Sequence, residues 1–160
     1  NQDAWIDPQT LGNLAHESIK HPDYAILSPV HLNGTGSELE KGFASYTQVN
    51  SRNNLPTENR LTECPFINAA FWFIPTGVLK KIGGFSSLFY HYGEDKDYVN
   101  RIHFHGYRIG YLPTVFGCHD REFRKVSLEG FMRAERVYLL SEYANINYNF
   151  RRLPMVYWQE

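Results

Sequence analysis

Two adjacent carboxylates, Glu94 and Asp95, mark the stretch of this sequence where chemistry is easiest to place. They follow Gly93, whose missing Cβ permits a tight backbone turn, and an aromatic run that ends at Tyr92. Apolar residues recur downstream at helical spacing, so the carboxylates are expected in the first turn of a helix. A fixed carboxylate can accept a hydroxyl proton, and aromatic faces pack on sugar rings. The pattern favours a saccharide site, although acidic residues also occur in first helical turns because they complement the helix dipole.

A longer ordered pattern surrounds these carboxylates. It begins with G-G-F at Gly83, continues through E-D-K-D at Glu94 to Arg101, and then shows G-Y-R at Gly106 and a later His119. In this order the motifs resemble the second half of a family 2 glycosyltransferase. They are most similar to the rhamnosyltransferase-like bacterial members of that family.

The resemblance, which covers roughly Asn1 to His119, implies an α/β fold. The chain would be the carboxyl-terminal half of a GT-A-type nucleotide-diphospho-sugar transferase, with a mixed sheet flanked by helices. Residues 1–122 would form this half-domain, and residues 123–160 a carboxyl-terminal amphipathic helix and an aromatic tail. The implied reaction is inverting transfer of a sugar from a nucleotide-diphosphate sugar to a saccharide or a lipid-linked acceptor.

The resemblance also implies roles for individual residues. Asp95 would be the general base that deprotonates the acceptor hydroxyl, and Glu94 would orient the acceptor. Asn68, Tyr92 and Gly93 would line the substrate site. An asparagine such as Asn68 can equally hydrogen-bond its local backbone, so that alternative stays open.

A divalent cation, Mg²⁺ or Mn²⁺, belongs to the implied chemistry. The resembling enzymes hold it with an acidic D-x-D-type motif, whose counterpart here is Asn1-Gln2-Asp3. Asp3 is the candidate ligand, Asn1 departs from the acidic pattern, and His119 matches a metal-ligating histidine that follows a strand. Because the chain opens inside this motif without an initiator Met, we expect a fragment of a longer enzyme. Alone it would be inactive, bind nucleotide sugars poorly and self-associate through exposed apolar surface.

Composition narrows the function classes. The 160 residues fit one domain, and a hydrophobic fraction of 42% favours a core over disorder. Lys+Arg 16 against Asp+Glu 17 leaves a formal charge of −1, which gives no reason to expect nucleic acid as a partner. Two cysteines, Cys64 and Cys118, do not indicate a disulfide scaffold. No apolar run reaches membrane-spanning length, so a cytoplasmic location is expected, with the inner face of the membrane as one possible site.

The elements that must position these residues follow from periodicity and from helix breakers. Helical spacing predicts four helices: one from Asp7-Pro8 with Leu11, Leu14, Ala15 and Ile19 on its apolar face, one ending near Ile82, one beginning at Glu94, and one from Ser127. Apolar runs predict strands at 24–30, 66–74, 107–112 and 114–118. The polar stretch 36–63 predicts a long surface loop with room for a short strand. Asp97 and Arg101, four residues apart, predict an ion pair on a helix face.

The last predicted helix has basic residues in it and near it, namely Arg124, Lys125, Arg133 and Arg136. A basic amphipathic helix can lie on a membrane surface, so peripheral membrane contact is one expectation for this segment. Packing of the helix on the core, with its charges in water, is the other.

Two further functional interpretations remain open. A non-catalytic carbohydrate-binding or interaction module would use the aromatic face without a base or a metal. A galactosyltransferase-like enzyme carries a G-G-E-D-D-type motif in its acceptor half, which Gly93-Glu94-Asp95 fits less fully. An upstream βαβ pattern that ends in an acidic pair would favour the transferase.

Overall fold

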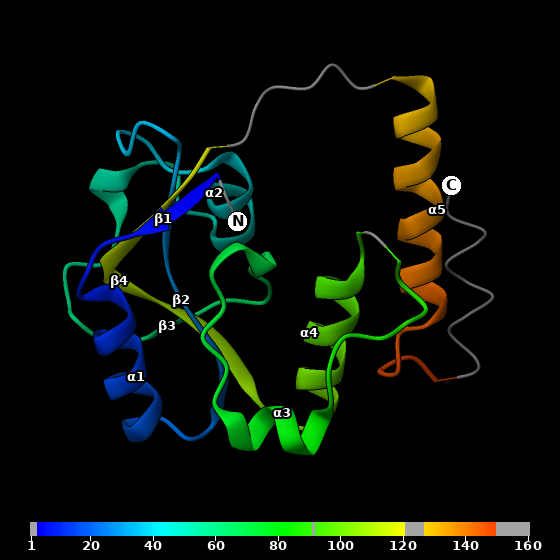
Figure 1. The fold of residues 1–160 in the computed structure, drawn as a ribbon, viewed down its shortest axis with the longest axis horizontal. Helices are drawn as coiled ribbons and strands as arrows, with labels where there is room; N and C mark the ends of the chain where they lie inside the picture. The colour runs from blue at the N-terminus through cyan, green and yellow to red at the C-terminus, as the bar shows by residue number, and fades with distance from the viewer. Residues whose placement is uncertain (1–2, 91, 121–126, 150–160) are drawn as a thin grey trace. The chain divides into compact units, whose positions relative to one another are not determined.

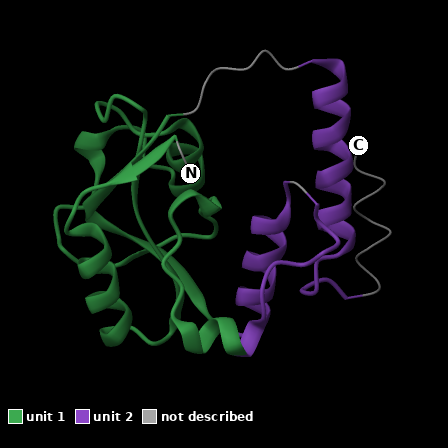
Figure 2. Cartoon of the chain, in the orientation of Figure 1, with its two compact units in different colours: residues 1–80, 107–123 green, residues 81–106, 124–160 purple. Residues whose placement is uncertain are grey.

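The computed structural model describes residues 3–90, 92–120 and 127–149 (Figure 1). The chain divides into two compact units, one of Asn1–Lys80 with Tyr107–Phe123 and one of Lys81–Gly106 with Arg124–Glu160 (Figure 2). The predicted boundary at 122/123 lies outside the described residues, as do Asn1, Arg124, Lys125 and the aromatic tail.

The first unit is built on a four-stranded mixed sheet, which confirms the predicted mixed α/β class. Its strands are β1 (Ala4–Ile6), β2 (Tyr24–Leu32), β3 (Thr62–Glu63) and β4 (Arg108–His119). β4 pairs parallel with β2 and antiparallel with both β1 and β3, so it is the strand that ties the sheet together. β1 was not predicted, because the resemblance led us to expect a helix after Asp3.

Two prolines, Pro29 and Pro113, lie inside strands, although we had predicted that each would end or divide its strand. β2 continues beyond Pro29 to Leu32, and β4 continues through Pro113 instead of forming two strands. The register between them jumps here: Pro29 pairs with Leu112, and the next residue, Val30, pairs with Phe116. Proline cannot donate to a strand ladder, so an irregularity at this position lets both strands continue.

Helix α1 (Thr10–Lys20) packs on β2 and β4, and Leu14 joins the apolar core. The predicted apolar face was wrong in part, since Leu11 and Ile19 are exposed whereas Thr10 and Glu17 are buried. The helix also begins at Thr10 and not at Asp7-Pro8. The Thr10 hydroxyl donates to a β4 carbonyl at 3.1 Å, which turns this polar residue toward the sheet.

The stretch 36–63, which was predicted as a long surface loop, contains a helix, so the prediction was wrong for that part of it. Helix α2 (Lys41–Thr47) follows Glu40, whose side chain accepts a hydrogen bond from the Phe43 amide at 2.9 Å. Phe43 is fully buried and holds the helix on the unit's core. A 3₁₀ turn (Arg52–Asn54) and the short strand β3 complete the stretch.

The apolar run 66–74 is not a strand, contrary to prediction. It forms a 3₁₀ turn (Ala69–Phe71) and pairs with β2 only at Phe73. The Asn68 side-chain oxygen accepts from the Ala70 amide at 3.2 Å, which caps the turn and bends the backbone away from an extended path.

The helices predicted around and within the second unit are confirmed. Helix α3 (Thr76–Ile82) ends at Gly83, which has a φ of +86°, and helix α4 runs over Glu94–Phe104. Helix α5 (Leu128–Tyr143) is capped by Ser127, whose hydroxyl accepts from the Gly130 amide at 3.1 Å.

The predicted ion pair between Asp97 and Arg101 is also confirmed, at 3.0 Å. Among the described residues, no helix combines the length and the apolar character needed to cross a membrane.

Candidate functional site

The predicted metal ligands Asp3 and His119 come together in the first unit. Ala4, next to Asp3, is the register partner of His119, and the Asp120 amide donates to the Asp3 carbonyl at 2.8 Å. These strand contacts place His119 Nε2 at 3.8 Å from Asp3 Oδ2. The His119 side chain is almost fully buried, whereas that of Asp3 is 49% exposed. The pair therefore joins a fixed imidazole to a carboxylate that solvent can reach.

The spacing of this pair is compatible with a shared cation. A separation of 3.8 Å is too long for a hydrogen bond, yet it is shorter than twice the ~2.1 Å that separates Mg²⁺ from a ligand. The other ring nitrogen, His119 Nδ1, is buried and has no hydrogen-bond partner among the described residues. No cluster of three or more ligating side chains occurs in the described part of the chain. The pair alone would supply two ligands to such a cation, so substrate oxygens or water would have to complete a six-coordinate shell.

A cavity of about 380 Å³ lies beside this pair, between β1 and the turn at 69–71. Its lining includes Trp5, Ala70 and Phe71, and the Phe71 ring meets the His119 ring edge-on at 6.2 Å. Asn68, a predicted substrate contact, comes directly before the lining residues and is buried. Its oxygen makes the expected local backbone bond, while its Nδ2 is buried without a partner among the described residues.

The predicted catalytic carboxylates start helix α4 in the second unit. Two successive residues before them are left-handed, with φ of +68° at Tyr92 and +84° at Gly93. A non-glycine residue in this region is strained, and such strain tends to occur at functional sites. Asp95 Oδ1 accepts from the Lys96 amide at 2.8 Å. Glu94 Oε2 is buried with no hydrogen-bond partner in the part of the chain that is described.

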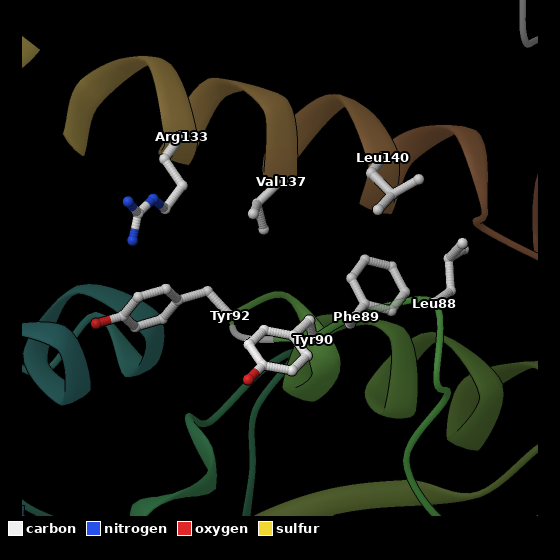
Figure 3. Close-up of a pocket in the computed structure, with 7 residues that line it drawn as sticks. All are labelled: Leu88, Phe89, Tyr90, Tyr92, Arg133, Val137 and Leu140. Carbon is white, nitrogen blue, oxygen red and sulfur yellow. The ribbon is translucent and has the colours of Figure 1, made fainter. Parts of the chain in front are cut away.

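A pocket of about 350 Å³ lies within the second unit, between the segment before α4 and helix α5 (Figure 3). We call it the α5 pocket; it is lined by Leu88, Phe89, Tyr90, Tyr92, Arg133, Val137 and Leu140. Sequence reasoning had placed Tyr92 at the substrate site and Arg133 among the basic residues of an amphipathic helix, but it had not brought the two together. The apolar α5 residues gave no signal of a pocket, because apolar residues at helical spacing look the same whether they fill a core or line a pocket.

Helix α5 is fixed to α4 by a charged cluster that the sequence did not reveal. Lys96 Nζ lies 2.6 Å from Glu142 Oε1 and 4.6 Å from the centre of the Tyr138 ring, and the Tyr148 hydroxyl donates to Glu142 Oε2 at 2.6 Å. Burial alone would raise the pKa of Glu142, but the hydrogen bonds from Lys96 and Tyr148 and the lysine charge lower it below 4.5. The same hydrogen bond raises the pKa of Tyr148. An ionised Glu142 therefore helps to hold α5, which forms one wall of the α5 pocket, against α4.

Glu142→Gln is expected to destabilise the second unit by about 1–2 kcal/mol at pH 7, the scale of charge-assisted hydrogen bonds. Because the folded-state pKa of Glu142 is lowered, its stabilisation is complete above 4.5 and disappears as the pH falls through the lowered value. Urea unfolding followed by circular dichroism measures how much the substitution lowers the free energy of unfolding at pH 7 and at pH 3. Glu129→Gln is the control, since its ion pair with Arg133 is exposed. An equal cost for Glu142→Gln at both pH values would contradict this account.

The predicted site residues thus belong to both units. Asp3, Asn68 and His119 lie in the first, and Tyr92, Gly93, Glu94 and Asp95 lie in the second. Comparison of the sequence with models of protein families and with curated protein sequences finds no match. Function must accordingly be argued from the residues and their geometry.

Proposed function

We propose that this chain carries the acceptor-side half of a GT-A-type glycosyltransferase, which moves a sugar from a nucleotide-diphosphate donor to an acceptor with inversion. The observation that carries the proposal is the left-handed pair Tyr92-Gly93, which begins helix α4 directly on Glu94 and Asp95. A strained tyrosine before two carboxylates at a helix start needs a reason beyond folding, and a fixed catalytic carboxylate supplies one. The motif order described above supports the same function.

In this proposal Asp95 accepts the proton of the acceptor hydroxyl as its oxygen attacks the anomeric carbon of the donor sugar. A positioned general base of this kind contributes about 10²–10⁴-fold to a rate. Glu94 orients the acceptor sugar. A hydroxyl group of that sugar would donate a hydrogen bond to the buried Glu94 Oε2. Attack from the side opposite the nucleotide inverts the anomeric centre.

Asp3 and His119 would hold the Mg²⁺ or Mn²⁺ ion in this proposal. When bound, such an ion neutralises the negative charge that grows on the leaving diphosphate. The solvent-accessible Asp3 carboxylate suits a site that must admit a diphosphate. The His119 ring is buried, so the surrounding protein holds it in place whether or not a diphosphate is bound. Asn68 and the cavity beside it would lie on the substrate side of this pair.

His119→Ala is expected to raise the Mn²⁺ concentration required for half-maximal sugar transfer by about tenfold or more, because one ligand and its support are lost. The measurement is a Mn²⁺ titration of transfer by the gene product that contains this chain, with a panel of nucleotide-diphosphate sugars as donors. His16→Ala, an exposed histidine on α1, is the control. An unchanged Mn²⁺ requirement would leave His119 a structural residue. Absence of transfer from every donor would favour the carbohydrate-binding module.

A further inference from the structure

Helix α5 presents a row of apolar side chains on the side turned away from the rest of its unit. The side that faces the unit is marked by the buried Ser141 and by Val137, whose Cγ1 would lie 2.7 Å from a Cβ added at Gly93. On the other side lie Leu128, Met132, Leu139 and Tyr143, with exposed fractions of 76%, 49%, 36% and 65%; we call them the α5 stripe. A single exposed apolar residue is ordinary, whereas four in a row on one helix indicate a surface that another molecule covers.

The spacing of the α5 stripe is that of a helix that pairs with another helix. Its residues are four, seven and four positions apart, so they stay on one side of α5 over about 22 Å. Side chains at these intervals form the seam along which two α-helices pack in a coiled coil. The occupant that this spacing fits is therefore a second α-helix.

Two opposite charges flank the middle of the α5 stripe. The half-buried Glu135 and the exposed Arg136 are neighbours in sequence, with Met132 and Leu139 between them around the helix. No residue three or four positions from Glu135 is basic, and none at that distance from Arg136 is acidic, so neither can pair along α5. The ion pairs that α5 forms among the described residues use Glu129, Arg133 and Glu142 instead.

The charge of α5 does not suit a membrane surface. The helix has two basic residues and three acidic ones, so it lacks the positive charge that holds amphipathic helices on anionic lipids. Insertion of the stripe would also carry Glu135 and Arg136 toward the acyl chains, where an unpaired charge costs free energy. A protein partner can offer each of these two residues the opposite charge instead.

A second copy of α5 supplies these charges when the two helices run in the same direction. A two-fold axis along parallel helices brings each flank of one stripe against the opposite flank of the other. Glu135 of one copy then faces Arg136 of the other, once on each side of the seam. In an antiparallel arrangement each flank meets its own counterpart, so glutamate would face glutamate and arginine would face arginine. Only the parallel pairing is complementary in charge.

We propose that this chain forms a parallel, two-fold symmetric dimer through the α5 stripe. Met132 and Leu139 pack against their own counterparts, Leu128 and Tyr143 extend the seam at its ends, and two pairs of Glu135 with Arg136 flank it. This pairing is a property of α5 and does not rest on the proposed sugar transfer. It also has a defined orientation, unlike the self-association through exposed apolar surface that is expected of a fragment.

Sedimentation velocity of the full 160-residue chain at low salt, over a wide range of concentrations, measures the dimer. Four side chains from each copy form a smaller interface than the about 1,200–2,000 Å² of a stable complex, so a Kd in the micromolar range or above is expected. Met132→Glu should raise this Kd at least about tenfold, because it removes apolar contact and places two like charges against each other in the seam.

An exchange of the two flanking charges tests the orientation. Glu135→Arg and Arg136→Glu should each raise the Kd about three- to tenfold, because each turns two attractions into two repulsions. The double variant exchanges the charges and should restore the wild-type Kd. An antiparallel dimer would show no such loss and rescue, since like charges would face each other in every variant.

Ile19→Glu is the matched control, because Ile19 is 79% exposed on α1 in the first unit; it should leave the Kd unchanged. Circular dichroism verifies that each variant keeps its helices. A chain that stays monomeric at every concentration would overturn the proposal. A dimer that Met132→Glu leaves intact, or that the double variant does not restore, would do the same. Binding of a monomer to vesicles of anionic phospholipid, abolished by Met132→Glu, would assign the stripe to a membrane instead.

Discussion

Asp95→Asn is expected to lower sugar transfer by about 10²–10⁴-fold in the gene product that contains this chain, the contribution of a positioned general base. Asparagine has nearly the same shape as aspartate, so helix α4 should keep its start and its contacts. It cannot accept the proton of the acceptor hydroxyl, so the attacking oxygen remains a poor nucleophile. Single-turnover transfer at saturating donor and acceptor measures the loss at the chemical step.

Two neighbours in the same helical turn provide controls. Glu94→Gln should reduce turnover less, because it alters acceptor orientation and leaves the base in place. Asp97→Asn should lower the free energy of unfolding more than turnover, since the buried Asp97 pairs with Arg101 at 3.0 Å. Near-wild-type turnover of Asp95→Asn would show that the base is another residue.

Local signals predicted the second unit well. The helix start at Ser127, the helix end at Ile82 and the Asp97–Arg101 spacing each depend on residues close in sequence, and each appears in the structure as predicted. Helices depend on contacts between residues three or four apart, so sequence patterns describe them directly.

The first unit was harder to predict because its elements depend on distant partners. The run 66–74 is as apolar as a buried strand, yet only Phe73 finds a strand partner and Asn68 caps a turn instead. At Pro113 the error was the opposite one, because we predicted a break where strand β4 continues. Its parallel partner β2 contains Pro29, and one irregularity in the pairing accommodates both prolines. Neither pairing can be inferred from residues adjacent in sequence.

The residues of the candidate site show the same difference between local signals and long-range contacts. The carboxylates were predicted because glycine and acidic residues signal a turn and a helix start locally. The proximity of Asp3 and His119 was expected only through the resemblance, since 115 residues lie between them in the sequence and only the β1–β4 pairing brings them together. The α5 pocket was not predicted, because Arg133 and Leu140 look like ordinary residues of an amphipathic helix. Only the fold shows that residues 88–90 and Tyr92 lie opposite them.

Gly93→Ala is expected to be the most damaging small substitution in the second unit, at about 2–5 kcal/mol. The left-handed φ of +84° costs an alanine about 1–2 kcal/mol, and overpacking adds about 1–3 kcal/mol. The overpacking arises because the new methyl group would lie 2.7 Å from Val137 Cγ1 and 2.9 Å from Phe89. Urea unfolding followed by the helical circular dichroism signal measures the cost.

Two other glycines of the unit separate strain from packing. Gly106 has a φ of +75° with open space around its missing Cβ, so Gly106→Ala should show the conformational cost alone. Gly84 has neither a positive φ nor a close neighbour, and Gly84→Ala should change stability by less than about 0.5 kcal/mol. If Gly93→Ala costs no more than Gly106→Ala, the turn is not packed on α5 as described. In that case the start of helix α4, and with it the position of Asp95, would not depend on the packing against helix α5.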